Sequence, residues 1–111
     1  MDSLGRWPWR RVLVRGSSMS PTLRDRDVVV VRSRARPRPG DVALVQWASR
    51  PAQLSLKRVV HADGSGWHVV GDNGGASTDS RELGPAEVLG VARWRFWPRP
   101  GRLPSGFTPF T

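Results

Sequence analysis

The sequence contains a single lysine, Lys57, beside seventeen arginines. A lysine acts as a general base only in its uncharged form, and an ordinary pKa near 10.4 leaves only about 0.1% of it neutral at pH 7.5. Burial lowers that pKa because it disfavours the charged form, whereas arginine does not deprotonate in proteins. A buried Lys57 could therefore activate a hydroxyl nucleophile, and no arginine could replace it.

Candidate hydroxyl nucleophiles gather in RGSSMSPTLRD, residues 15–25, where three serines surround one methionine: Ser17, Ser18, Met19 and Ser20. Arginine, glycine, serine and proline are common loop residues, and the methionine is the exception among them. The segment either turns the chain or presents one hydroxyl for chemistry. The residue types alone leave open which serine that is.

The two histidines, His61 and His68, offer the other familiar base, as in a Ser-His-Asp triad. Alternation along the expected strand 54–62 puts His61 on the same face as Lys57. His68 is expected opposite His61 in a hairpin. We expect cross-strand packing for this pair, rather than catalysis.

Short valine-rich runs separated by proline, glycine and aspartate predict a mainly β fold, a small coiled antiparallel sheet or barrel. A break at RPAQ (50–53), a hairpin turn at DGSG (63–66), a polar loop over 72–84 and one helical turn at PAEV (85–88) complete the pattern. The expected strands are 11–15, 27–33, 41–47, 54–62, 67–71 and 88–97.

The hairpin register positions Lys57. If Ala62 pairs with Trp67, Lys57 lies opposite about Asp72, at the start of the polar loop. The lysine would then have apolar neighbours on one side and a hydroxyl-rich loop on the other. On the last strand, Trp94 and Phe96 share a face, and we expect them to pack in the core; a membrane-facing patch that includes Trp97 is the alternative.

The length of 111 residues predicts one domain, over 1–97, with a proline-rich tail without regular structure over 98–111. The absence of cysteine excludes disulfides, thiolate nucleophiles and cysteine-based zinc sites. We expect no metal and no cofactor. No apolar run approaches the roughly 18–20 residues that a membrane helix needs, so a cytoplasmic protein without a transmembrane anchor is expected.

The formal net charge of +9 has three interpretations. An arginine-rich solvated surface is favoured over a phosphate-binding role and over attraction to an acidic partner or a membrane surface. A basic β module that binds nucleic acid is therefore kept as an alternative function, and no specific nucleic acid is expected as a partner.

Three blocks, GSSMSPTL (16–23), KRV (57–59) and GDNGGASTDSR (71–81), resemble in order the type I signal peptidase family of serine proteases. The resemblance extends over roughly 11–97. It implies the catalytic-core fold of that family with minimal insertions, and a Ser-Lys dyad that hydrolyses peptide bonds without metal or cofactor.

Carried over by position, Ser18 is the nucleophile and Lys57 the general base. Ser77 matches the serine that orients the lysine, and Asp79 and Arg81 match a pair that braces the loop. The resemblance also implies that Met19 points inward and that the Ser18 backbone N–H holds the oxyanion. Because Gly16 stands where some members have an assisting serine, Ser17 or a backbone donor remains as the second donor.

We expect no membrane anchor of the kind usual in the family, and in this the chain resembles the soluble maturation proteases of nickel-type superoxide dismutase. We therefore expect a serine endopeptidase that removes an N-terminal leader from a protein substrate, with the precursor of that dismutase as the implied candidate. The enzymatic alternative is a signal peptidase that reaches exported preproteins through peripheral membrane contact.

Overall fold

The computed structural model describes residues 8–76 and 78–106. Seven strands form one antiparallel sheet in the order β1-β2-β6-β3-β4-β5, with β7 paired to β6 at the side. The sheet is open, and β1 and β5 are its two ends. The predicted fold class is confirmed as a small coiled antiparallel sheet rather than a closed barrel. The elements are β1 (Trp9–Leu13), β2 (Val28–Ser33), β3 (Val42–Trp47), β4 (Arg50–Asp63), β5 (Gly66–Val70), the 3-10 helix η2 (Gly74–Ala76), α1 (Ser80–Leu83), β6 (Glu87–Trp97) and β7 (Gly101–Arg102).

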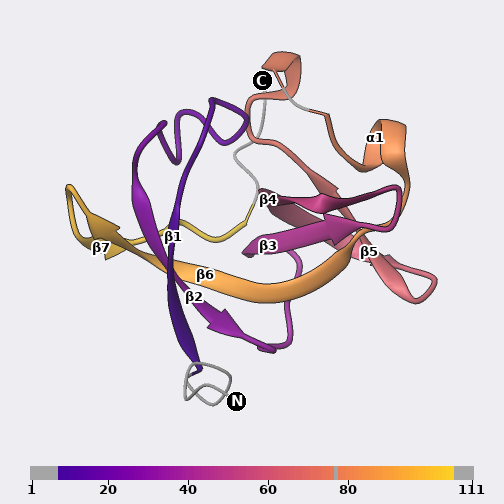
Figure 1. Ribbon diagram of the computed structural model, residues 1–111, viewed down its shortest axis with the longest axis horizontal. Helices are drawn as coiled ribbons and strands as arrows, with labels where there is room; N and C mark the ends of the chain where they lie inside the picture. The colour runs from indigo at the N-terminus through magenta and orange to yellow at the C-terminus, as the bar shows by residue number, and fades with distance from the viewer. Residues whose placement is uncertain (1–7, 77, 107–111) are drawn as a thin grey trace.

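The long strand β6 curves across the molecule and joins β1–β2 on one side to β3–β5 on the other (Figure 1). Register shifts along its pairings with β2 and β3 supply the bending. At Gly90 the neighbouring strand comes so close that a Cβ would lie 2.7 Å from the Arg32 carbonyl oxygen. Glycine is therefore required at this close approach of the two strands.

Two buried clusters lie on either side of β3 and β4. Alternation along β4 places Leu56 in the first cluster and Val59 in the second. Lys57 and Arg58 consequently project from opposite faces of one strand. The first cluster contains Val14, Met19, Leu23, Val29, Val31, Val42, Leu44, Leu56, Ala92 and Leu103, and the second Ala43, Val45, Trp47, Val59, Val69 and Ala86.

The predicted pairing of Ala62 with Trp67 is confirmed, and the His61 and His68 rings stack across the hairpin with centroids 5.1 Å apart. A register shift between Val59 and His61 displaces the pairing by one residue, so that Val59 pairs with Val69 and Arg58 with Val70. The strands predicted at 27–33, 41–47 and 88–97 are also present, within one residue at each end.

Three predictions about local structure are wrong. The break at 50–53 is absent, because β4 begins at Arg50 and pairs it with Trp47 across a tight turn. The helical turn at 85–88 is absent, because Ala86 forms a bridge with Trp67 and β6 begins directly after it. In the tail, β7 pairs with β6, and Leu103 is buried in the first cluster.

The expectation that Trp94 and Phe96 pack in the core is also wrong, since 48% and 47% of their surfaces are exposed. They do share a strand face, but it is the outer one. Arg95 between them points inward, where its Nη1 donates to the Thr22 carbonyl at 3.1 Å and lies 3.7 Å from Asp27. The sequence pattern fixes the alternation without telling which face meets solvent.

Candidate active site

Ser18 lies in a turn that follows β1 and is closed at its base by two backbone hydrogen bonds. The Val14 N–H donates to the Asp27 carbonyl, and the Arg26 N–H donates to the Val14 carbonyl, both at 2.7 Å. Met19 is 1% exposed and packs in the first cluster, whereas Ser18 is only half-buried. The methionine therefore anchors the turn and leaves the Ser18 side of it toward solvent.

Three carbonyls of this turn, those of Ser17, Ser18 and Met19, accept hydrogen bonds. Asn73 donates through its backbone N–H to the Ser18 carbonyl at 2.8 Å and through Nδ2 to the Ser17 carbonyl at 3.2 Å. The Leu23 N–H donates to the Met19 carbonyl at 2.9 Å. No acceptor within residues 8–76 and 78–106 binds the Ser18 N–H. That N–H is thus available to an incoming oxyanion.

Gly16 precedes the serines with φ at +83°, a conformation that side chains disfavour. Its N–H donates to Asp25 Oδ1 at 2.7 Å, so this donor is already used. Ser17 is exposed, and both residues line the same groove as Ser18. A second oxyanion donor, if it comes from this turn, would therefore be Ser17 rather than the Gly16 backbone.

Lys57 lies in the buried middle of β4, paired with Ala43 of β3 and 4% exposed. Burial lowers its pKa from the ordinary 10.5 because it penalises the ammonium form, the nearby Asp79 carboxylate partly opposes this shift, and the Arg81 guanidinium adds to it. A larger fraction of Lys57 is therefore neutral near pH 7 than in an exposed lysine.

The loop after β5 is fixed by Asp79, which is 1% exposed. Its Oδ2 accepts from the Gly71 N–H at 3.0 Å and from Arg81 Nη2 at 2.8 Å, and its Oδ1 caps α1 through the Arg81 N–H at 3.1 Å. Burial would raise the pKa of Asp79, but these hydrogen bonds outweigh it and lower the pKa to about 2. Asp79 is thus an anion at neutral pH, and it holds the loop beside Lys57.

Ser77, predicted to orient the lysine, lies outside the described residues. Its neighbour Thr78 lines the groove together with Ser18 and Lys57. The sequence reasoning did not single out Thr78, although the hydroxyl-rich GASTDS run was the available signal. The loop therefore delivers at least one hydroxyl-bearing residue to the side of the groove where Lys57 lies.

An open groove of about 600 Å³ runs between the end of β1, the serine turn and the first half of β4. Ser18 and Lys57, which are far apart in the sequence, both line it. Two exposed leucines, Leu13 and Leu54, also line its wall. The groove is lined by Val12, Leu13, Val14, Arg15, Gly16, Ser17, Ser18, Met19, Leu44, Arg50, Gln53, Leu54, Ser55, Leu56, Lys57 and Thr78.

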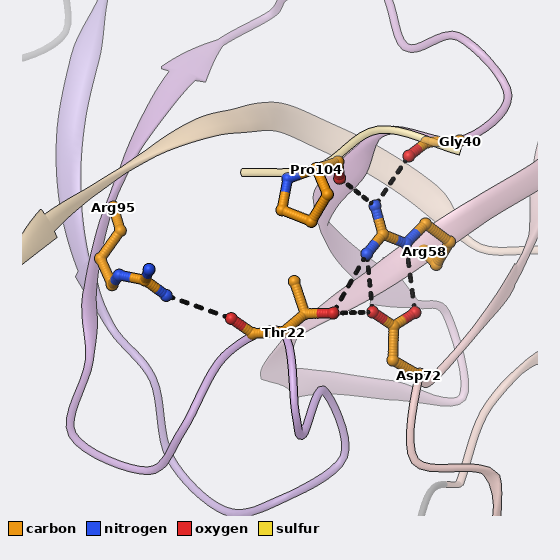
Figure 2. A network of polar contacts seen from close by, with 6 residues as sticks. All are labelled: Thr22, Gly40, Arg58, Asp72, Arg95 and Pro104. Carbon is orange, nitrogen blue, oxygen red and sulfur yellow. Dashed lines mark hydrogen bonds and ion pairs between the residues drawn. The ribbon is translucent and has the colours of Figure 1, made fainter. Parts of the chain in front are cut away.

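Arg58 of β4 is the centre of a hydrogen-bond network that joins the serine turn, the start of the polar loop and the segments at Gly40 and Pro104 (Figure 2). It is 2% exposed, and its Nε and Nη2 donate to the two Asp72 oxygens at 3.1 and 2.6 Å. Its Nη1 donates to the carbonyls of Gly40 at 2.8 Å and Pro104 at 2.7 Å. The Thr22 hydroxyl donates to Asp72 Oδ2 at 2.6 Å, which links the serine turn to the same carboxylate.

This network is the main feature that sequence reasoning missed. The hydrogen bonds of Asp72 to Thr22 and of Asn73 to the Ser18 carbonyl hold the start of the polar loop against the serine turn. Arg58 was overlooked. It shares a strand face with Leu56, and a single arginine on an otherwise apolar face predicts a buried, fully paired side chain.

A family model described as Peptidase S24-like matches residues 11–92. The chain belongs to this family. Membership in the S24-like peptidases supports the predicted serine peptidase class at the level of the family. No curated protein matches the chain.

The described residues form neither a cluster of metal ligands nor a membrane-spanning helix. Among residues 8–76 and 78–106, no group of three histidine, aspartate or glutamate side chains is arranged to hold a metal ion. Over that same part of the chain, no helix has the length and apolar character needed to cross a membrane.

Proposed function

We propose that this S24-like peptidase is a serine endopeptidase in which Ser18 is the nucleophile and Lys57 the general base. The observation that carries the proposal is that both residues line one groove, with Lys57 on a buried strand where its pKa is lowered. A lysine with a lowered pKa can act as the base that a serine nucleophile needs.

The reaction begins when neutral Lys57 Nζ takes the proton of Ser18 Oγ as Oγ attacks the scissile carbonyl carbon. The Ser18 N–H stabilises the oxyanion that forms. The C–N bond then breaks, the Lys57 ammonium protonates the leaving amine, and the acyl group stays on Ser18. Water attacks this ester with Lys57 again accepting a proton, and the proton returns to Ser18 Oγ as the acid leaves.

For the substrate, we propose a protein whose N-terminal leader enters the groove as an extended segment. The precursor of nickel superoxide dismutase is the candidate that the subgroup resemblance implies. Ser77 is proposed to orient Lys57, and Asp79 and Arg81 to brace the loop that carries it.

The test is leader cleavage by purified protein, followed by mass spectrometry of both fragments. Ser18→Ala and Lys57→Arg should abolish cleavage, and His61→Ala, which removes a ring stacked outside the groove, should retain it. Full activity of Ser18→Ala would contradict the proposal. Loss of activity in His61→Ala, with the fold intact by circular dichroism, would favour a histidine base instead.

One observation favours a second candidate, a signal peptidase that works at a membrane surface. Three large aromatic side chains near the end of β6 are about half exposed: Trp94, Phe96 and Trp97. If they contact lipid, anionic vesicles should accelerate cleavage by wild type and not by a Trp94→Ser, Trp97→Ser variant. Equal rates with and without vesicles would remove this candidate.

A further inference from the structure

Two arginines line the walls of the groove. Arg15 lies on the serine turn and Arg50 at the start of β4. Both are exposed, so their guanidinium groups are accessible to a ligand. No aspartate or glutamate is among the described residues that line this groove.

We propose that the groove selects peptides that carry carboxylates near the cleavage site, and that Arg15 and Arg50 are the specificity-determining residues. This inference rests on the proposed function. It adds the substrate class: an extended acidic peptide, with apolar side chains where Leu13 and Leu54 line the wall.

The course of the strands indicates where the carboxylates belong. β1 leads into the serine turn and β4 runs toward Lys57, and Ser18 and Lys57 line the same groove. Arg15 lies in the turn three residues before Ser18, so at most about 11 Å of chain separates them. A strand rises about 3.3 Å per residue, which puts Arg50 about 23 Å from Lys57 along β4. An extended peptide would then meet Arg15 within about three residues, and Arg50 about seven residues, from the bond that is cut.

Each wall of the groove includes a strand edge with which such a peptide could pair. β1 is an end strand of the sheet, and β5 pairs with β4 only from Arg58 onward. An added strand can hydrogen-bond to free edges while its side chains contact the walls. In the serine turn, Asp25 accepts the Gly16 N–H and lies 3.8 Å from Arg26, so its charge is already partly compensated.

The expected effects are moderate because the arginines face solvent. An exposed pair changes affinity by about two- to five-fold, and the change shrinks as salt screens the charges. A peptide with aspartates at both positions should therefore be cleaved with about ten-fold higher kcat/KM than a matched peptide with lysines there.

The experiment is a charge exchange between enzyme and substrate. Arg15→Glu, Arg50→Glu should reverse the preference, so that the lysine peptide becomes the better substrate at low salt. Arg36→Glu, Arg38→Glu is the matched control, since both arginines are exposed, lie outside the groove and change the net charge by the same amount. Reversal confined to the groove variant supports the inference, and equal rates for both peptides, or an equal effect of the control variant, would overturn it.

Fluorescence anisotropy of labelled peptides on Ser18→Ala separates this inference from the proposed function. Binding to this variant needs no catalysis. If wild type cleaves neither peptide while Ser18→Ala still binds the acidic one more tightly, the protease assignment fails and the recognition stands. If cleavage is normal and the two peptides bind equally, only the recognition fails.

Discussion

Lys57 and Arg58 are consecutive residues of β4, both almost fully buried, and they meet opposite environments. The Arg58 guanidinium donates to both oxygens of Asp72 and to the carbonyls of Gly40 and Pro104. The Lys57 ammonium lies beside an open groove, and burial lowers its pKa. The Arg58 guanidinium is therefore held by several acceptors, whereas burial shifts the pKa of Lys57 in the direction that favours the neutral amine.

The difference shows how a strand can supply structure on one face and chemistry on the other. A guanidinium keeps its charge and forms several fixed hydrogen bonds, which suits a permanent tie between segments. An amine exchanges its proton as its surroundings change, which suits a general base. The two cations are therefore not interchangeable.

The largest expected effect comes from replacing Lys57 with the other cation. Lys57→Arg should lower kcat/KM by at least about 10³-fold, because guanidinium cannot accept the Ser18 proton. Arg58→Lys should leave measurable cleavage per folded molecule, since the base is unchanged. Peptide cleavage assays check both, and a Lys57→Arg enzyme within ten-fold of wild type would refute the base assignment.

Arg58→Met should show the opposite pattern, a loss of stability. Removing one partner of a buried pair costs about 3–5 kcal/mol, because Asp72 and two carbonyls lose their donor. Urea unfolding at pH 7 measures this. Arg36→Met, an exposed control, should stay within about 0.5 kcal/mol of wild type, and an equally small change in Arg58→Met would show that the network contributes little.

Asp79→Asn tests the anion that moderates Lys57. The folded-state pKa of about 2 lies below the ordinary 3.8, so the stabilisation from Asp79 is present above about pH 4 and is lost as pH falls toward 2. Wild type should lose about 2 kcal/mol over this range that the variant does not lose. Because Asp79 raises the Lys57 pKa, the acidic limb of the activity profile should also move to lower pH in Asp79→Asn. A shift to higher pH would contradict the described electrostatics.

The smallest expected effect is that of Lys57→Met on stability. Burial penalises the Lys57 ammonium, so an apolar side chain of similar length should leave the free energy of unfolding within about 1 kcal/mol of wild type or raise it. Wild-type stability should increase as pH rises toward 10.5, because the folded-state pKa is the lower one, and this increase should be absent in Lys57→Met. Thermal unfolding of wild type and Lys57→Met across pH 7–10 measures this difference in the pH dependence of stability.

The strands were largely predictable because valine-rich runs separated by turn residues carry a local signal, and the Ala62–Trp67 pairing followed from the hairpin turn. The exposure of Trp94 and Phe96 could not be predicted, since the alternation along a strand is the same whichever face is buried. The start of β4 at Arg50 was not predicted either, because the pairing of Arg50 with Trp47 overrides the weak strand propensity of the proline that follows.

The candidate site divides in the same way. Ser18, Lys57 and the Asp79–Arg81 pair stood out through residue type and motif order. The hydrogen bonds from Arg58 to Gly40 and Pro104 join positions far apart in the chain, and no local pattern encodes them. The lowered pKa of Lys57 depends on burial by β3 and the loop, which only the assembled fold shows.

Because the chain has a single lysine, its ionisation can be followed directly. Protein labelled with ¹³C-lysine should show one side-chain signal in heteronuclear NMR, and its shift can be titrated from pH 6 to 11. The account predicts a midpoint below 10.5 that coincides with the acidic limb of kcat/KM and moves to 10.5 on unfolding. A folded-state midpoint at or above 10.5 would contradict Lys57 as the general base.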